Sequence, residues 1–183
     1  MTTLDSRCLE AFPGWLRSLA EDAQKLAGLL ESADASAAAQ RGAASALNYL
    51  FKSLDLIPDG LEDLGFIDDA FVLRVAAAQV IAEEQAGAGK DESGILLKLS
   101  AEAALIHEFL AADFPRLERY VQKLADGSAR GRSVAQVLED AAARADFVRE
   151  VKQWAEGYAA PSFARDSRSL VKLKSFLSTR LPQ

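Results

Sequence analysis

Apolar residues recur at intervals of three and four positions along most of the chain, which is the pattern of helices that bury one face. Pro13 and Gly14 predict the start of the first helix, and Asp34 is the predicted N-cap of the second. No stretch alternates between polar and apolar residues for long enough to predict a strand. The apolar stripes span residues 16–30, 39–50, 71–81, 95–110, 114–124, 134–158 and 170–181.

Two of these helices suggest how the bundle is packed. The stripe over 39–50 is rich in alanine, and such small side chains let another helix approach closely. The helix predicted over about 68–85 is apolar around most of its circumference, which is typical of a central, buried helix. The glycines of Gly87-Ala88-Gly89 predict its end, and Ser133 with Gln136 fits a capping box at the start of a later helix.

These patterns predict an all-α fold, a single-domain bundle of six or seven helices that spans residues 1–183. An Asp-Leu-Ile-Pro-Asp turn at 55–59 separates two of its core helices. Residues 36–85 form the motif region of this domain, and residues 91–183 form a helical extension of unknown kind.

Composition places the chain among ordinary globular proteins, because 50% of its residues are hydrophobic and 26% are charged. Cys8 is its only cysteine, which excludes an intrachain disulfide and is typical of a reducing compartment. The first residues lack the apolar run of a secretory signal, and the longest uncharged stretch, 42–51, is far shorter than the about 20 residues of a spanning helix. We therefore expect a cytoplasmic protein without a transmembrane segment.

Charge is distributed unevenly along the chain, whose net charge is −6. This acidity disfavours nucleic acid as a partner. Six acids and no base lie between Lys52 and Arg74, whereas near the end five bases face only Asp166. These two groups are either complementary surfaces of one fold or docking patches of opposite sign. The acids are Asp55, Asp59, Glu62, Asp63, Asp68 and Asp69, and the bases are Arg165, Arg168, Lys172, Lys174 and Arg180.

One segment carries several unlike residues at fixed offsets, namely Tyr49, Asp55, Pro58, Asp59, Gly65, Asp68 and Asp69. This segment resembles the YkvA-like family of bacterial domains, and the resemblance covers about residues 36–85. The family pattern is a tyrosine near a helix end, an Asp-Leu-Ile-Pro-Asp turn, a glycine, and an Asp-Asp pair that leads into an apolar helix. Members often have proline where this chain has Ser53. Because the family has no known function, the resemblance implies an element of fold and no activity.

The aspartates of this segment have two interpretations that the sequence leaves open. As structural residues, Asp59 would lie in the first turn of a short helix that Gly65 ends, Asp68 and Asp69 would begin the next helix, and Asp55 would form an Asx turn. As ligands, Asp55, Asp59, Asp68 and Asp69 would hold Mg²⁺ or Ca²⁺, which prefer oxygen donors. The spacing does not match an EF-hand loop, and a pair of these carboxylates could instead serve a hydrolase-like enzyme as acid and base.

No other segment carries a complete catalytic set. His107 is the only histidine, Cys8 has no activating neighbours beyond Arg7, and no nucleotide-binding loop is present. We therefore interpret the chain as a non-catalytic protein–protein interaction or regulatory module, which could also associate with itself. The alternatives are a cation-binding or hydrolase-like role for the aspartates, and contact of the basic C-terminal helix with a membrane surface. The candidate interaction residues on that helix are Arg168, Lys172, Lys174, Leu173 and Leu177.

Overall fold

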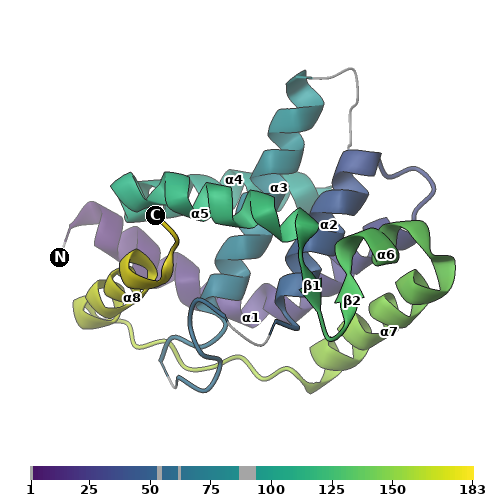
Figure 1. Cartoon of the computed structure of the whole chain (residues 1–183). Coiled ribbons are helices and arrows are strands. Elements are labelled where there is room, and N and C mark those ends of the chain that lie inside the picture. The colour runs from purple at the N-terminus through teal and green to yellow at the C-terminus, as the bar shows by residue number, and fades with distance from the viewer. Residues whose placement is uncertain (1, 53–54, 62, 87–93) are drawn as a thin grey trace.

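The computed structural model describes residues 2–52, 55–61, 63–86 and 94–183, and these residues form the predicted all-α bundle (Figure 1). Its elements are α1 (Thr3–Glu31), α2 (Ala37–Tyr49), α3 (Ile67–Ala86), α4 (Gly94–Leu110), the 3-10 turn η1 (Ala111–Asp113), α5 (Phe114–Lys123), the 3-10 turn η2 (Leu124–Asp126), β1 (Ser128–Ala129), β2 (Arg132–Ser133), α6 (Val134–Glu139), α7 (Ala141–Gly157) and α8 (Ser167–Arg180).

Helix α1 begins earlier than its sequence predicts. Thr2 forms a capping box in which its hydroxyl accepts a hydrogen bond from the Asp5 amide (3.1 Å) and its amide donates to the Asp5 carboxylate (2.8 Å). The prediction of a start at Pro13 is therefore wrong, since Pro13 lies inside the helix. The cap and the buried residues that precede Pro13, among them Phe12 at 0% exposure, offset the backbone hydrogen bond that proline cannot make.

Helix α2 packs closely on α3, as its small residues predict. A Cβ atom on Gly42 would lie 2.3 Å from a methyl group of Val80 in α3, so only glycine allows this approach. The predicted cap of this helix is wrong by two residues, because the hydroxyl of Ser36, rather than Asp34, accepts a hydrogen bond from the Ala39 amide (3.0 Å).

The C-terminal half is more divided than its hydrophobic pattern indicates. One long helix was expected over 134–158, but Asp140 ends α6 and caps α7 by accepting hydrogen bonds from the amides of the next helix (2.8 and 3.3 Å). The described residues therefore form seven longer α-helices and the six-residue α6. The predicted loop at 126–132 contains a two-stranded hairpin, in which Arg130 (φ 49°) and Gly131 (φ 74°) form the turn. The predicted capping box at Ser133 and Gln136 is present.

Helix α3 lies at the centre of the bundle, in contact with α1, α2, α4 and α5 (Figure 1). Helices α7 and α8 pack on α1, and one continuous hydrophobic cluster includes residues of every α-helix. The extension over 91–183 thus shares its core with the motif region. None of the described helices combines the length and apolarity needed to cross a bilayer. The predictions for Ser53 and for Gly87-Ala88-Gly89 concern positions outside the described residues.

Candidate functional site: the acidic corner

The four candidate aspartates lie where α2 ends, the loop over 55–66 turns, and α3 begins, and we call Asp55, Asp59, Asp68 and Asp69 the acidic corner. The described residues at 58–61 and 63–65 do not form the short helix predicted after Pro58. They make separate turns instead, with hydrogen bonds from the Leu61 amide to the Pro58 carbonyl (3.0 Å) and from the Gly65 amide to the Leu61 carbonyl (2.8 Å).

Tyr49 and Asp68 hold this loop against α3. The Tyr49 hydroxyl donates a hydrogen bond to Oδ2 of Asp68 (2.6 Å) and accepts one from the Leu56 amide (2.8 Å). The Ile57 amide donates to the same Asp68 oxygen (3.0 Å). Tyr49 and Asp68 are 1% and 0% exposed. Both motif residues therefore have a structural role, which is to satisfy two loop amides that would otherwise be buried without acceptors.

Gly65 and Phe66 complete the turn into α3. A Cβ atom on Gly65 would lie 2.2 Å from the Asp59 carbonyl oxygen, so the backbone, rather than a helix end, requires glycine here. Phe66 adopts φ 64°, which costs a non-glycine residue about 1–2 kcal/mol. Its ring packs edge-on against Trp154 of α7 (6.2 Å between centroids) and against Tyr158, the C-cap of that helix (5.2 Å), and these contacts offset that cost.

The carboxylates of the corner are poorly compensated. Asp68 and Asp69 are 0% and 2% exposed, Asp55 is half-buried and Asp59 is exposed. Oδ1 of Asp55, Oδ1 of Asp68 and Oδ2 of Asp69 have no hydrogen-bond donor among the described residues. Burial raises the pKa of Asp68 to about 6. Burial, then the charges of Asp59 and Asp68, raises the pKa of Asp55 to about 7. Burial and the three other carboxylates raise the pKa of Asp69 well above its usual value.

These shifts predict that the protein loses stability as the pH rises. The folded chain holds the protons of Asp55, Asp68 and Asp69 more tightly than the unfolded chain, so folding takes up protons between the ordinary Asp pKa of about 3.9 and a pH of about 7. The free energy of unfolding of the cation-free protein should therefore fall across this window. Melting temperatures measured in chelator at pH 5, 6 and 7 would contradict this if they stayed level or rose.

The corner, as it stands, does not enclose a metal ion in protein ligands. No three His, Cys, Asp or Glu side chains in the described part of the chain are placed to hold one ion together. At most two of the carboxylates could therefore bind a cation directly. This conformation disfavours acid–base catalysis by Asp68 and Asp69, because a dissolved substrate does not reach either carboxylate.

A second buried charge cluster was not found by sequence reasoning. Arg74 of α3 is 0% exposed and pairs with Asp22 of α1 (3.3 Å) and Glu102 of α4 (2.7 Å). Its guanidinium also stacks on Trp15 (4.4 Å to the ring centroid), and Lys98 pairs with Asp22 (2.8 Å). The available signal was a single base within an otherwise apolar helix, which indicates a buried partner.

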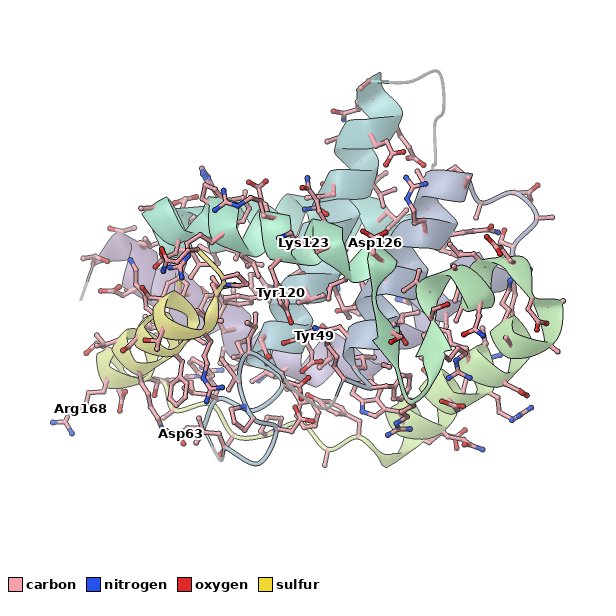
Figure 2. The ribbon with its side chains drawn as sticks, viewed as in Figure 1. Tyr49, Asp63, Tyr120, Lys123, Asp126 and Arg168 are labelled. Atoms are coloured by element: carbon pink, nitrogen blue, oxygen red, sulfur yellow. The ribbon has the colours of Figure 1, made fainter. Side chains whose placement is uncertain are left out.

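The candidate residues of α8 divide into two faces. Leu173 and Leu177 are 0% exposed and belong to the core. Lys172 pairs with Asp63 of the loop (2.9 Å), and Lys174 lies 5.9 Å from the Phe109 ring centroid. Arg168 projects away from the helix (Figure 2). Leu173 and Leu177 therefore pack α8 against the core, whereas the bases lie on the surface of the helix.

The remaining sequence candidates occupy structural positions. The His107 ring packs edge-on against Phe114 (4.7 Å between centroids). Cys8 is 0% exposed, and burial raises the pKa of its thiol to about 11, which disfavours the reactive thiolate.

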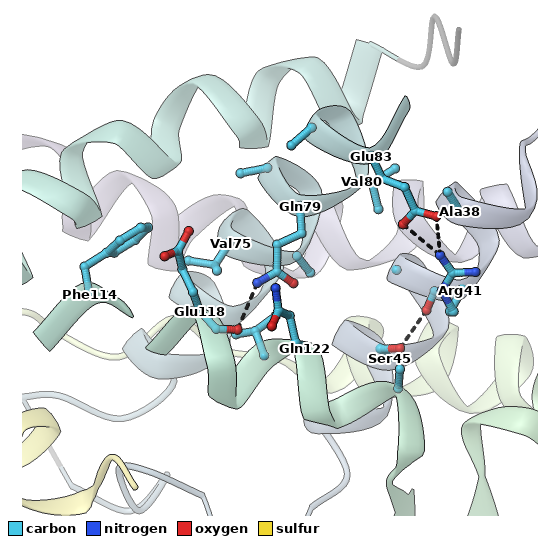
Figure 3. A pocket seen from close by; sticks show the side chains of 16 residues that line it. Ala38, Arg41, Ser45, Val75, Gln79, Val80, Glu83, Phe114, Glu118 and Gln122 are labelled. Carbon is cyan, nitrogen blue, oxygen red and sulfur yellow. Dashed lines mark hydrogen bonds and ion pairs between the residues drawn. The ribbon is translucent and has the colours of Figure 1, made fainter. Parts of the chain in front are cut away.

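A groove of ≈ 420 Å³ lies between α2, α3 and α5 (Figure 3). Its rim carries an ion pair between Arg41 and Glu83 (2.7 Å) and a hydrogen bond from the Gln79 amide to the Glu118 carbonyl (2.9 Å). No residue of the acidic corner lines it, so the groove and the corner are separate features.

The segment that contains the acidic corner is similar to a known family. No curated protein and no solved structure matches the chain. A family described as a protein of unknown function (DUF1232) matches residues 42–74, which include all the motif residues and Arg74. This segment is therefore similar to a family of unknown function, and the narrower resemblance to YkvA-like domains stays a prediction.

Proposed function

We propose that this chain is a non-catalytic, cytoplasmic interaction module that binds an acidic partner protein through the outer face of α8. The observation that carries this proposal is the exposure of Val171, whose side chain is 70% exposed in the middle of that face. Leu97 of α4, at 51%, is the other large hydrophobic residue exposed in the described part of the chain. A single exposed apolar residue is ordinary, so the argument depends on what surrounds Val171.

Val171 lies in a shallow depression of ≈ 440 Å³ along α8. The residues that line it repeat at steps of four, which places them in one stripe that a second helix could follow. Phe176 adds a half-buried aromatic ring at one end, and aromatic rings are favoured anchors in interfaces. The lining residues are Ser167, Arg168, Val171, Lys172, Ser175 and Phe176.

Charge favours an acidic partner. Arg165, Arg168, Lys174 and Arg180 are exposed, and none of them pairs with a described carboxylate within 4 Å. These four bases, on α8 and just before it, belong to a chain whose net charge is −6, so this segment differs in sign from the protein as a whole. An acidic surface would be steered toward it, and complementary charge would fix the orientation of the partner.

A double variant, Arg168→Glu with Val171→Asp, tests this proposal because both side chains are exposed and their loss leaves the core intact. The matched control is Leu97→Asp, which removes the other exposed apolar side chain. We expect a purified acidic partner, identified by capture with the wild type, to bind the control normally and the double variant at least about tenfold more weakly, a loss of about 1.4 kcal/mol.

Three results would contradict the proposal. Equal binding to all three proteins would place the interface elsewhere. A wild-type mass that doubles with concentration in light scattering, and a double variant that remains monomeric, would make the partner a second copy. Sedimentation with phosphatidylserine vesicles at low salt, without any protein partner, would assign the basic face to an anionic membrane surface.

A further inference from the structure

The protein compensates one buried carboxylate fully and leaves two others without a counter-charge. Asp22, 1% exposed, pairs with both Arg74 and Lys98. By contrast, no described Lys, Arg or His nitrogen lies within 4 Å of any carboxylate of the acidic corner. The charge of Lys52 lowers the pKa of Asp55, but the Lys52 ammonium donates its hydrogen bond to the Tyr120 hydroxyl (3.0 Å) and not to the carboxylate. Buried charges in proteins are paired or coordinate metals, so the corner lacks a positive partner.

The unpaired atoms are specific oxygens. Asp68 uses Oδ2 to hold the loop, while its Oδ1 accepts nothing from the described residues. Oδ2 of Asp69, on the neighbouring residue, and Oδ1 of the half-buried Asp55 are in the same condition. An unsatisfied buried acceptor is destabilising and rare in native proteins, and a bound ion is one of its accepted explanations. The exposed Asp59 lies within electrostatic range of all three.

The chemistry of these donors selects the ligand. All four side chains present hard carboxylate oxygens, and the sole described histidine and cysteine are engaged elsewhere, which disfavours Zn²⁺. Because no three acidic side chains are placed around one point, the ion must keep water in its coordination shell. Mg²⁺ has this habit, since it is commonly bound through one or two carboxylates and retains several waters.

We propose that the acidic corner binds one divalent cation, preferentially Mg²⁺, through the unpaired oxygens of Asp55, Asp68 and Asp69. No more than two of these oxygens contact the ion directly, and the others bind it through water. The cation gives the acidic corner a positive partner, as Arg74 and Lys98 do for Asp22. It also stiffens the loop over 55–66, which Asp68 holds at Ile57 and which Asp63 joins to α8 through Lys172. This site stands apart from partner binding by the outer face of α8.

The test is a thermal melt of the purified full chain in chelator, in MgCl₂ and in CaCl₂, each at matched ionic strength set with KCl. At about a hundred times its dissociation constant, the cation should raise the Tm of the wild type by about 5–10 °C. Asp69→Asn keeps the shape of the side chain but cannot take up the negative charge that a cation requires. This variant should melt above the wild type in chelator and should not respond to Mg²⁺. The matched control, Asp34→Asn, changes an exposed acid outside the corner and should respond as the wild type does.

Calorimetric titration of Mg²⁺ into the same proteins gives a second readout that does not depend on stability. We expect one site per chain in the wild type and in Asp34→Asn, and none in Asp69→Asn. The proposal is overturned if the wild type shows neither heat nor a Tm shift with Mg²⁺ or Ca²⁺. It is equally overturned if Asp69→Asn responds as the wild type does, because the ion would then bind elsewhere. Neither measurement involves a partner, so failure here leaves the proposed function of α8 untouched.

Discussion

Replacing Arg74 with methionine is expected to lower the free energy of unfolding by about 3–5 kcal/mol. The side chain is fully buried between α1, α3 and α4, and methionine would fill much of its volume without its charge. Glu102 would keep only a 3.9 Å contact with Lys98, and Asp22 would lose one of its two cations. The contact of the guanidinium with Trp15 would also be lost. Urea denaturation of the wild type and the variant measures the difference.

Two further variants separate buried charge from charge in general. Lys25→Ala breaks an ion pair with Glu21 whose side chains are 55% and 65% exposed, and it should leave the free energy of unfolding nearly unchanged. The triple variant Arg74→Met, Asp22→Leu, Glu102→Leu removes the buried charges together, and it should recover most of the lost stability. An Arg74→Met variant as stable as the wild type would show that the carboxylates relax to solvent at little cost.

Tyr49→Phe is expected to lower the free energy of unfolding by about 2–4 kcal/mol, although it removes a single oxygen atom. That hydroxyl accepts from the Leu56 amide and donates to Asp68, so its loss leaves a buried amide without an acceptor and takes one donor from a buried carboxylate. Each such defect costs about 1–3 kcal/mol. Because the loop over 55–66 is attached through these bonds, its amides should also exchange with solvent faster, which hydrogen-exchange mass spectrometry measures.

Tyr120→Phe is the natural comparison for Tyr49→Phe. The two rings lie edge to face, 6.0 Å apart, but the Tyr120 hydroxyl only accepts a hydrogen bond from the half-buried Lys52. Lys52 can turn to water, so this variant should cost less than about 1.5 kcal/mol. Equal effects of the two variants would mean that the loop does not depend on the Tyr49 hydroxyl.

The sequence predicted those parts of the fold that depend on local pattern. Apolar spacing indicated the helices, the apolar circumference of 68–85 indicated the central position of α3, and the alanines around Gly42 indicated close packing of α2. The errors arose where tertiary contacts overrode local rules. Pro13 lies within α1 because the residues before it are buried, and Asp140 interrupts an apolar stripe that has no break of its own.

The site shows the same division. The motif predicted that its aspartates gather at one corner, because turn residues separate two helices that must pack together. It did not show that Asp68 accepts from Tyr49 and Ile57, since no spacing rule relates those positions. Arg74 lies 52 residues from Asp22 and on a different helix, so this pair follows only from how α1 and α3 are placed in space. Long-range pairs of this kind require the structure.

Helix α1 also imposes an order on the synthesis of the chain. Its buried residues contact α2, α3 and α4, but also α7 and α8, which leave the ribosome much later. The residues between Glu31 and Ala141 take roughly 5–20 s to translate at about 5–20 residues per second. During that interval part of the apolar stripe of α1 has no partner within the nascent chain. The growing polypeptide is therefore most exposed to aggregation, and most dependent on chaperones, before α7 and α8 emerge.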